Sequence, residues 1–451
     1  MKLKGKNIAI LGFGMEGRDV ASYLKKRGID FTICDIKNRK DLDVKGFEEA
    51  KFICGDKYLR ELNKFDVIFR SPGIYRYKKE IIEAENTGSF ITSATNLFFE
   101  ECRGKIIGIT GTKGKGTTAN LIYKSFENDK KNAYLLGNIG LPILEKLEKI
   151  KNDTWVVLEL SSFQLIDLEL SPHVAVVLNI TQDHLDWHKD IDEYVDSKKN
   201  IVIHQTSNDY AIISYDYATS RSFSKLGKGK KYYFSRNRKV KGSFIENGRI
   251  FLNTLSKPKA IAETEELSLR GTHIEENVTA AVCASYLAGV SNSSIKKAIV
   301  DYKGYEHRME FVEKIEGVEF YNDSAATGPH STMAAVTSFD RPITLILGGF
   351  DKGINYDQFA KDLAQNENVK NILLIGDISK KLEILLKQSK YNGKLLNLGE
   401  SPMKVIVKKA KEAAGSNGIV LLSPAASSFD MFKNYKDRGD QFKKAVKDLN
   451  K

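Results

Sequence analysis

The feature that most constrains this chain is a turn rich in lysine and glycine between an apolar run and a helix-forming run. Thr110-Gly-Thr-Lys-Gly-Lys115-Gly-Thr-Thr118 follows the apolar run 106–109 and leads into a helix expected from Ala119. A strand, a glycine turn and a helix in this order form a phosphate-binding loop. The backbone amides of such a loop bind the phosphates of a nucleotide, and the lysine neutralises the negative charge of the β- and γ-phosphates. A flexible surface loop does not fit between a buried strand and a helix, so the turn predicts a nucleotide site in an α/β sheet.

A second glycine turn lies near the start of the chain. Gly12-Phe-Gly14-Met-Glu-Gly17 follows a strand-like run at 7–11, and Asp35 ends the next expected strand. The spacing of about twenty residues is typical of a dinucleotide-binding turn, whose acid accepts a ribose hydroxyl. Nucleotides other than NAD bind to the same kind of turn at a helix amino terminus, and a purely structural turn can have the same glycine pattern. The pattern alone leaves these three interpretations open.

Two further expected strands end in residues that suit a metal ion. Glu159 ends the apolar run that starts at Trp155, and the run 174–179 is followed by Thr181-Gln-Asp-His184. Because parallel strands place their carboxyl ends at one edge of a sheet, we expect Glu159 and His184 near the phosphate loop. There they could hold magnesium that bridges ATP phosphates. A single loop histidine is more often an ordinary hydrogen-bonded residue.

Strand-like and helical runs alternate along the whole chain, which is typical of α/β architecture with parallel sheets. The pattern changes near residues 95 and 304. We therefore expect three α/β domains, at 1–95, 96–304 and 305–451.

The composition excludes several classes of protein. The formal net charge is +12, but the lysines are spread through the chain, so we expect a solvated surface and no nucleic acid. No apolar run has the roughly 18 residues of a spanning helix, and the first residues enter a strand directly, so we expect no membrane partner and a cytoplasmic protein. The cysteines lack metal-like spacing and are expected to be free thiols. They are Cys34, Cys54, Cys102 and Cys283.

An ordered set of segments resembles the Mur ligases over essentially the whole chain. The segments are SPG (71–73), TGTKGKGTT, GNIG (137–140), LELSSFQL, NITQDHLDWH, EHRMEF (306–311), YNDSAATG, LGGFDKG and LLSPAASSFDMFKNYKDRG. SPG and SFQL are similar to the branch that adds glutamate to UDP-N-acetylmuramoyl-L-alanine. The resemblance implies a Rossmann-like N-terminal domain for the UDP-sugar, a central P-loop ATPase domain and a Rossmann-like C-terminal domain for the amino acid.

The same resemblance implies an ATP-dependent ligase of peptidoglycan precursor synthesis that works through an acyl phosphate. Its cofactors would be ATP and two magnesium ions, with no NAD, and the chain would be a monomer. The acceptor and amino acid would contact Gly14, Met15, Asp35, Lys37, Ser71, Gly73, Asn138, Gln164, Thr327, Lys352, Ser428 and Tyr435.

ATP would be bound from two regions of the chain. By resemblance, its contacts are Gly111, Thr112, Lys113, Gly114, Lys115, Gly116, Thr117, Thr118, Asn277, Arg308 and Asp323. The implied catalytic residues are Lys115, Asn138, Glu159, His184 and Lys198, and the implied metal site uses Thr117, Glu159, His184 and Lys198. Lys198 matches the family's carbamylated lysine, whose modification replaces a cation by an anion. Lys199 is the rival for that role.

Several positions depart from the family pattern. Gly116 stands where a magnesium-binding Ser or Thr is usual, and we expect Thr117 or Glu159 to compensate. Ala325 replaces a lysine near the amino-acid site, which leaves the added residue open. Ile274 replaces an asparagine, and Ile36-Lys37 replaces a Thr-Arg pair, so Lys37 keeps charge without the bidentate fork.

Three alternatives remain at this point. A related ligase could add L-glutamate or another amino acid, or act on folate. An NAD-dependent dehydrogenase would use the first glycine turn but leave the phosphate loop, Glu159 and His184 idle. A non-catalytic ATP-binding regulator would explain Gly116 and Ala325.

Overall fold

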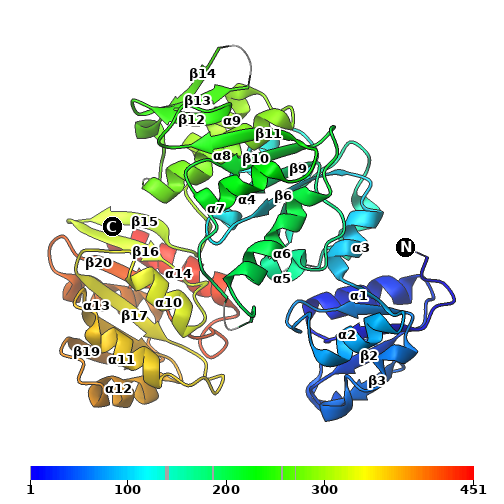
Figure 1. The fold of residues 1–451 in the computed structure, drawn as a ribbon. Coiled ribbons are helices and arrows are strands. Elements are labelled where there is room, and N and C mark those ends of the chain that lie inside the picture. Colours follow the sequence, from blue (N-terminus) through cyan, green and yellow to red (C-terminus); the bar gives the residue numbers. More distant parts are fainter. Residues whose placement is uncertain (1, 138–141, 185–186, 255–256, 270, 451) are drawn as a thin grey trace. The chain divides into compact units, whose positions relative to one another are not determined.

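The chain folds into two compact units, Met1–Tyr302 and Lys303–Lys451, each built of alternating strands and helices (Figure 1). The computed structural model describes residues 2–137, 142–184, 187–254, 257–269 and 271–450. The first unit contains a five-stranded and a nine-stranded sheet, and the second contains a six-stranded sheet.

The first sheet is wholly parallel, with strand order β3-β2-β1-β4-β5. The central strands β1 and β4 are fully buried because α1 and α3 pack on one face of the sheet and α2 on the other. The strand order reverses between β1 and β4, so the turns after these strands flank one crevice. The elements are β1 (Ile8–Leu11), α1 (Met15–Lys26), β2 (Thr32–Asp35), β3 (Lys51–Cys54), β4 (Val67–Arg70), α2 (Lys79–Asn86), β5 (Phe90–Thr92) and α3 (Ala94–Glu101).

The central sheet has the order β14-β13-β12-β11-β10-β9-β6-β8-β7, and β6 lies between β8 and β9. The pairs from β7 to β12 are parallel, and β12, β13 and β14 pair antiparallel. Its strands are β6 (Lys105–Thr110), β7 (Ala133–Gly137), β8 (Trp155–Glu159), β9 (Val174–Val177), β10 (Tyr210–Ser214), β11 (Lys230–Ser235), β12 (Gly242–Glu246), β13 (Arg249–Asn253) and β14 (Lys259–Glu263).

Helices cover both faces of the sheet around β6, which explains the apolar runs of β6, β8, β9 and β10. Alternate residues of β6 face opposite sides: Ile107 and Ile109 pack with α4, α8 and α9, and Ile106 packs in the core that includes α5 and α6. The helices are α4 (Lys115–Asn128), α5 (Ser162–Leu165), α6 (Ile191–Ile203), α7 (Ala218–Ser222), α8 (Thr272–Leu287) and α9 (Asn292–Val300).

The second unit has the strand order β15-β16-β20-β17-β18-β19, in which only the β15–β16 pair is antiparallel. Two apolar cores lie on the two faces of this sheet. Its elements are β15 (Glu310–Ile315), β16 (Val318–Asn322), α10 (Pro329–Val336), β17 (Ile343–Gly348), α11 (Asp357–Gln365), β18 (Val369–Ile375), α12 (Ser379–Gln388), β19 (Lys394–Gly399), α13 (Met403–Ala414), β20 (Ile419–Leu422) and α14 (Tyr435–Lys447).

The predicted α/β class with mostly parallel sheets is confirmed. The domain boundaries at 95 and 304 stay predictions. Within the described ranges, no helix combines the length and apolar character needed to cross a membrane.

Candidate active site

The phosphate loop lies at the carboxyl end of β6, beside the ends of β8 and β9. The turn after Thr110 leads into α4, which begins at Lys115 and has Thr117 and Thr118 in its first turn. Gly114 adopts a left-handed backbone with φ of 84°, and a Cβ there would lie 2.2 Å from Asn277 Oδ1. Glycine is therefore required, and the backbone amides at the start of α4 form the kind of helix amino terminus that binds phosphate oxygens.

Lys115 places its ammonium over this loop. Its Nζ donates to the carbonyl oxygens of Gly111 and Thr112, each at 3.0 Å. Burial lowers the pKa of Lys115, and the charges of Glu159 and Asp183 oppose that shift. A poorly hydrated ammonium beside carboxylates is well placed to bind a polyanion bridged by metal.

Lys198 reaches the same loop from α6. The side chain is 1% exposed, and Nζ donates to Thr110 Oγ1 and to the Gly111 carbonyl oxygen, each at 3.3 Å. Burial holds the pKa of Lys198 well below its usual value, and the charge of Lys115 lowers it further. These conditions favour a neutral amine at this position.

Thr112 connects three segments of the site. Its Oγ1 donates to the carbonyl oxygen of Thr181 at 2.9 Å, accepts from the Thr181 N–H at 2.9 Å, and lies 2.9 Å from the Tyr194 hydroxyl. The loop after β9 and helix α6 are thereby held against the phosphate loop. Lys113 is exposed, and its N–H donates to Asn179 Oδ1 at 3.4 Å.

The predicted metal ligands are only partly gathered. Glu159 ends β8 and is 9% exposed, whereas the His184 side chain is 45% exposed, with its ring centroid 4.8 Å from that of Phe163. Among the residues described, no three His, Cys, Asp or Glu side chains form a metal-binding cluster. Glu159 and Asp183 both act on Lys115, and carboxylate oxygens are the donors that magnesium prefers, so the donor chemistry fits this ion.

The first glycine turn is shaped by close packing. Gly12 has φ of 83°, and a Cβ on Gly17 would lie 1.9 Å from the Gly12 carbonyl oxygen, so α1 can approach the turn only with glycine there. Ser71 Oγ donates to that same carbonyl at 2.8 Å. Gly14, Met15 and Gly73 are exposed around this point.

Asp35 is buried and organises the backbone around the turn. Its carboxylate accepts from the N–H of Phe13 at 2.7 Å and from the N–H of Lys37 at 2.8 Å. The turns after β1 and β2 are therefore joined through this side chain, a structural role that the spacing did not predict. The Lys37 side chain is exposed.

Gln164 lies on α5 and links it to the first glycine turn. Ser161 and Gln164 form a capping box, with Ser161 N–H donating to Gln164 Oε1 at 3.0 Å. Gln164 Nε2 donates to Glu16 Oε1 at 2.9 Å, and burial raises the pKa of Glu16 to about 7. Asn138, also expected to contact the acceptor, lies outside the described residues.

In the second unit, the loops after β16, β17 and β20 follow neighbouring strands. They carry the predicted amino-acid contacts Thr327, Lys352 and Ser428, and Tyr435 begins α14. Ser428 is 2% exposed, and Lys352 Nζ lies 6.0 Å from the ring centroid of the exposed Phe429.

Arg438 holds two of these loops together. Its guanidinium donates to the carbonyl oxygens of Ser324, Ala426 and Ser427 at 2.9, 3.0 and 3.2 Å, and to Ser324 Oγ at 2.9 Å. The chain before Ser428 is thus tied to the loop after β16. Although burial lowers the pKa of Arg438 to about 10, the side chain stays charged at neutral pH.

Asp323, a predicted nucleotide contact, is buried beside these loops. It accepts from Ser423 Oγ at 2.7 Å and from the Met309 N–H at 3.1 Å. Burial raises its pKa to about 6, against the opposing charge of Arg308, its predicted partner in nucleotide binding. Asn277, the remaining predicted nucleotide contact, lies in the first unit and accepts from Thr118 Oγ1 at 3.4 Å.

Residue patterns had assigned no role to His188, Asp183, Arg70 or Arg438. His188 is buried, with Nε2 2.9 Å from Ser162 Oγ and Nδ1 3.0 Å from Glu193 Oε1. Its spacing of four residues from His184 was a usable signal. For Arg70, a basic residue at a strand end, the sequence contained no such signal.

Comparison with known families accounts for most of the chain. A family described as Mur ligase MurD-like, N-terminal domain, matches residues 6–93. The Mur ligase middle domain matches residues 109–285, and the Mur ligase glutamate ligase domain matches residues 307–426.

Individual relatives match over nearly their full length. A protein from Acetivibrio thermocellus named UDP-N-acetylmuramoylalanine--D-glutamate ligase is 38% identical, covering 99% of this chain and 97% of the relative. A Clostridium tetani protein of the same name is 37% identical, covering 98% and 97%. The fold resembles a pseudomurein peptide ligase type C from Methanothermus fervidus, with a TM-score of 0.52 and 20% identity, covering 99% of this chain and 100% of that one. The three matching domains and these full-length identities show that the chain belongs to the Mur ligase family of ATP-dependent, amide-bond-forming ligases.

Proposed function

We propose that this enzyme joins D-glutamate to UDP-N-acetylmuramoyl-L-alanine at the expense of ATP. The observation that carries the proposal is the phosphate loop at the end of β6, where Lys115 lies among Glu159, Asp183 and the buried Lys198. The names and full-length similarity of the relatives support this acceptor and this amino acid. They favour D-glutamate at the point where Ala325 had left the amino acid open.

The reaction begins when the alanyl carboxylate attacks the γ-phosphorus of ATP, forming an acyl phosphate and releasing ADP. The amine of glutamate then attacks the acyl carbon, loses a proton and expels phosphate, which leaves the amide. Lys115 and the amides at the start of α4 offset the charge that gathers on the transferred phosphoryl group. Magnesium, held by Glu159 with Asp183 or His184 nearby, would supply further positive charge to the phosphates.

Carbamylation of Lys198 is part of this proposal. The neutral amine attacks carbon dioxide, an N–C bond forms and a proton is released, so a neutral amine becomes an anionic carbamate. Burial and the depressed pKa of Lys198 support this chemistry. Lys199 is a poorer candidate because its side chain is 33% exposed and it pairs with Asp196. The carbamate would add an anionic oxygen ligand near the phosphate loop.

Binding of the two other substrates follows the topology of the sheets. The uridine nucleotide is proposed to lie at the switch point between β1 and β4, near Gly14 and the turn 71–73. Gln164 would contact the muramoyl-alanine end of the acceptor. For glutamate, Lys352 and the hydroxyls of Thr327, Ser428 and Tyr435 supply the donors that two carboxylates need.

The remaining expectations are the division into three domains, a monomeric state and a cytoplasmic location. The three separate sheets support the first. All four cysteines lie in the described part of the chain and are unpaired, which supports a reducing compartment.

The test is release of phosphate from ATP with purified enzyme, magnesium and UDP-N-acetylmuramoyl-L-alanine. D-glutamate and L-glutamate are compared, and an arm without acceptor measures background hydrolysis. We expect release above background with D-glutamate, together with a product heavier by one glutamyl residue. Release that is independent of acceptor, or faster with another amino acid, would overturn the assignment.

A further inference from the structure

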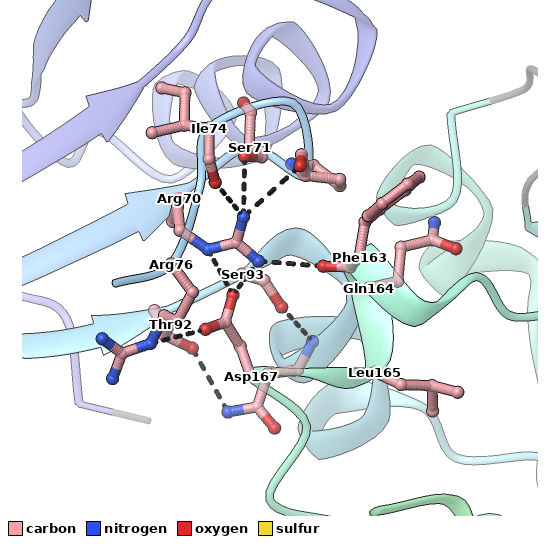
Figure 2. Close-up of polar contacts among 12 residues, drawn as sticks. Arg70, Ser71, Ile74, Arg76, Thr92, Ser93, Phe163, Gln164, Leu165 and Asp167 are labelled. Carbon is pink, nitrogen blue, oxygen red and sulfur yellow. Dashed lines mark hydrogen bonds and ion pairs between the residues drawn. The ribbon is translucent and has the colours of Figure 1, made fainter. Parts of the chain in front are cut away.

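Arg70 is a buried arginine at the end of β4, immediately before the turn 71–73. It is 1% exposed, and its guanidinium contacts two different parts of the first unit (Figure 2). On its own side, Nη1 donates to the carbonyl oxygens of Ser71 at 3.2 Å and Ile74 at 2.5 Å. On the other side lies the part of the chain that forms the central sheet, and we call this boundary the interface. There, Nη2 donates to the carbonyl oxygen of Phe163 in α5 at 2.9 Å.

The charge of Arg70 is balanced from the central sheet's side of this interface. Nε donates to Asp167 Oδ2 at 2.7 Å, and Nη2 lies 2.5 Å from the same oxygen. Both side chains are essentially inaccessible, at 0% and 1% exposure. Arg76 adds a second contact, with Nε 2.9 Å from Asp167 Oδ1. Asp167 therefore lies between two arginines that belong to the N-terminal part of the chain.

A buried ion pair of this kind is poor evidence for stability, because desolvating both charges offsets much of their attraction. Its geometry is informative instead. A guanidinium is a rigid planar group with five donors, so groups bound to it keep a defined spacing. Here one plane connects the 71–74 backbone with the Phe163 carbonyl, one residue before Gln164.

We propose that Arg70 is a positioning residue that holds the turn 71–73 and helix α5 at a fixed distance and orientation. Both ends of the acceptor then bind to one rigid surface. The inference rests on the proposed function, in which the turn contacts the uridine nucleotide and Gln164 contacts the muramoyl-alanine end. A second link, from Gln164 Nε2 to Glu16 Oε1 at 2.9 Å, joins the same helix to the first glycine turn.

The test compares ligands that reach one or both sides of the interface. Arg70→Met keeps an apolar side chain of similar length and removes the guanidinium. Arg70→Lys keeps the positive charge but lacks the planar group with its five donors. Calorimetry measures the dissociation constants of UDP, UDP-N-acetylmuramoyl-L-alanine and a non-hydrolysable ATP analogue. Arg249→Met, which breaks an exposed ion pair with Glu263 on β13 and β14, is the matched control.

We expect both Arg70 variants to weaken binding of the full acceptor by about tenfold or more, because small misplacement of binding groups has large effects. Binding of UDP alone should change by less than about threefold, since a changed spacing between the turn 71–73 and α5 affects only a ligand that contacts both. The ATP analogue should bind as in the wild type, and Arg249→Met should behave as wild type throughout. Equal losses for UDP and the full acceptor, or no loss for either, would overturn the inference.

Hydrogen exchange supplies a measurement that needs no ligand. In Arg70→Met, amides at 71–74 and 162–166 should exchange faster together, and those of α4 should not change. Should that variant fail to fold, Asp167→Asn tests the same spacing with less disruption and is expected to shift acceptor binding in the same direction. A wild type that binds no acceptor would refute the proposed function itself, whereas normal wild-type binding with unaltered variants refutes only the role of Arg70.

Discussion

Asp323 provides a quantitative test of the electrostatics in the second unit. It is 4% exposed, and its carboxylate has hydrogen bonds only from Ser423 and the Met309 N–H among the contacts observed in the described structure. Burial raises its pKa from 3.8 to about 6. In Asp323→Asn, the amide oxygen can accept from Met309, and the amide nitrogen can donate to Ser423 Oγ, which then turns its own proton to Thr332 Oγ1, 3.0 Å away. The substitution therefore removes the charge with little change in shape.

The magnitude follows from the pKa shift. The native protein holds the proton more tightly than the unfolded chain, so the associated stability is full below about pH 4 and is lost as the pH rises through 6. A shift of about two pKa units corresponds to about 3 kcal/mol. Relative to wild type, Asp323→Asn should gain about 3 kcal/mol of unfolding free energy between pH 4 and pH 7.

The assay is urea unfolding across this pH range, with exchange of the β16 and β20 amides reporting on the second unit alone. Subtracting the wild-type curve from the variant curve removes the contributions of distant groups. At neutral pH the variant should be more stable and yet slower in ATP turnover, since Asp323 is a predicted nucleotide contact. A stability difference that does not change with pH would refute the reasoning.

Three further substitutions test the site. Lys198→Ala should lose most activity in the phosphate-release assay; added bicarbonate should not restore it, whereas a short carboxylic acid should do so in part, and undiminished turnover would exclude the carbamate. Gly114→Ala should weaken binding of an ATP analogue by at least about tenfold in calorimetry, because its Cβ meets Asn277 and the backbone is left-handed; unchanged affinity would contradict this packing. Arg438→Met leaves buried carbonyls unpaired and should lower the unfolding free energy of the second unit by about 3 kcal/mol; a loss below about 1 kcal/mol would show that these bonds are dispensable.

The local elements of the site could be predicted from the sequence, because their causes are local. An apolar run, a glycine turn and a helix-forming run specify the phosphate loop, and the left-handed φ of Gly114 agrees with that expectation. The alternation of strand and helix likewise indicated the α/β class. The glycines of the first turn had a similar local cause, since Gly17 must pass close to the Gly12 carbonyl oxygen.

Roles that depend on strand order could not be predicted in the same way. Asp35 stays a predicted substrate contact, and the spacing did not reveal that its carboxylate also accepts two backbone N–H groups. Glu159 and His184 follow β8 and β9, the strands on either side of β6, but spacing along the chain did not reveal that Asp183 also acts on Lys115. Nor could two adjacent lysines be told apart by pattern, whereas burial separates Lys198 from Lys199.

By itself, the sequence determined the class of the fold, the phosphate loop and the family, because each can be recognised from short stretches of consecutive residues. Only the tertiary structure decided which distant side chains share a buried environment. Arg70 and Asp167 are 97 positions apart, and Arg438 and Ser324 are 114 apart. Packing removes water from both partners at once, and a buried polar group is costly unless it is paired, so each partner depends on the other; this burial is a property of the assembled layers and of no single segment.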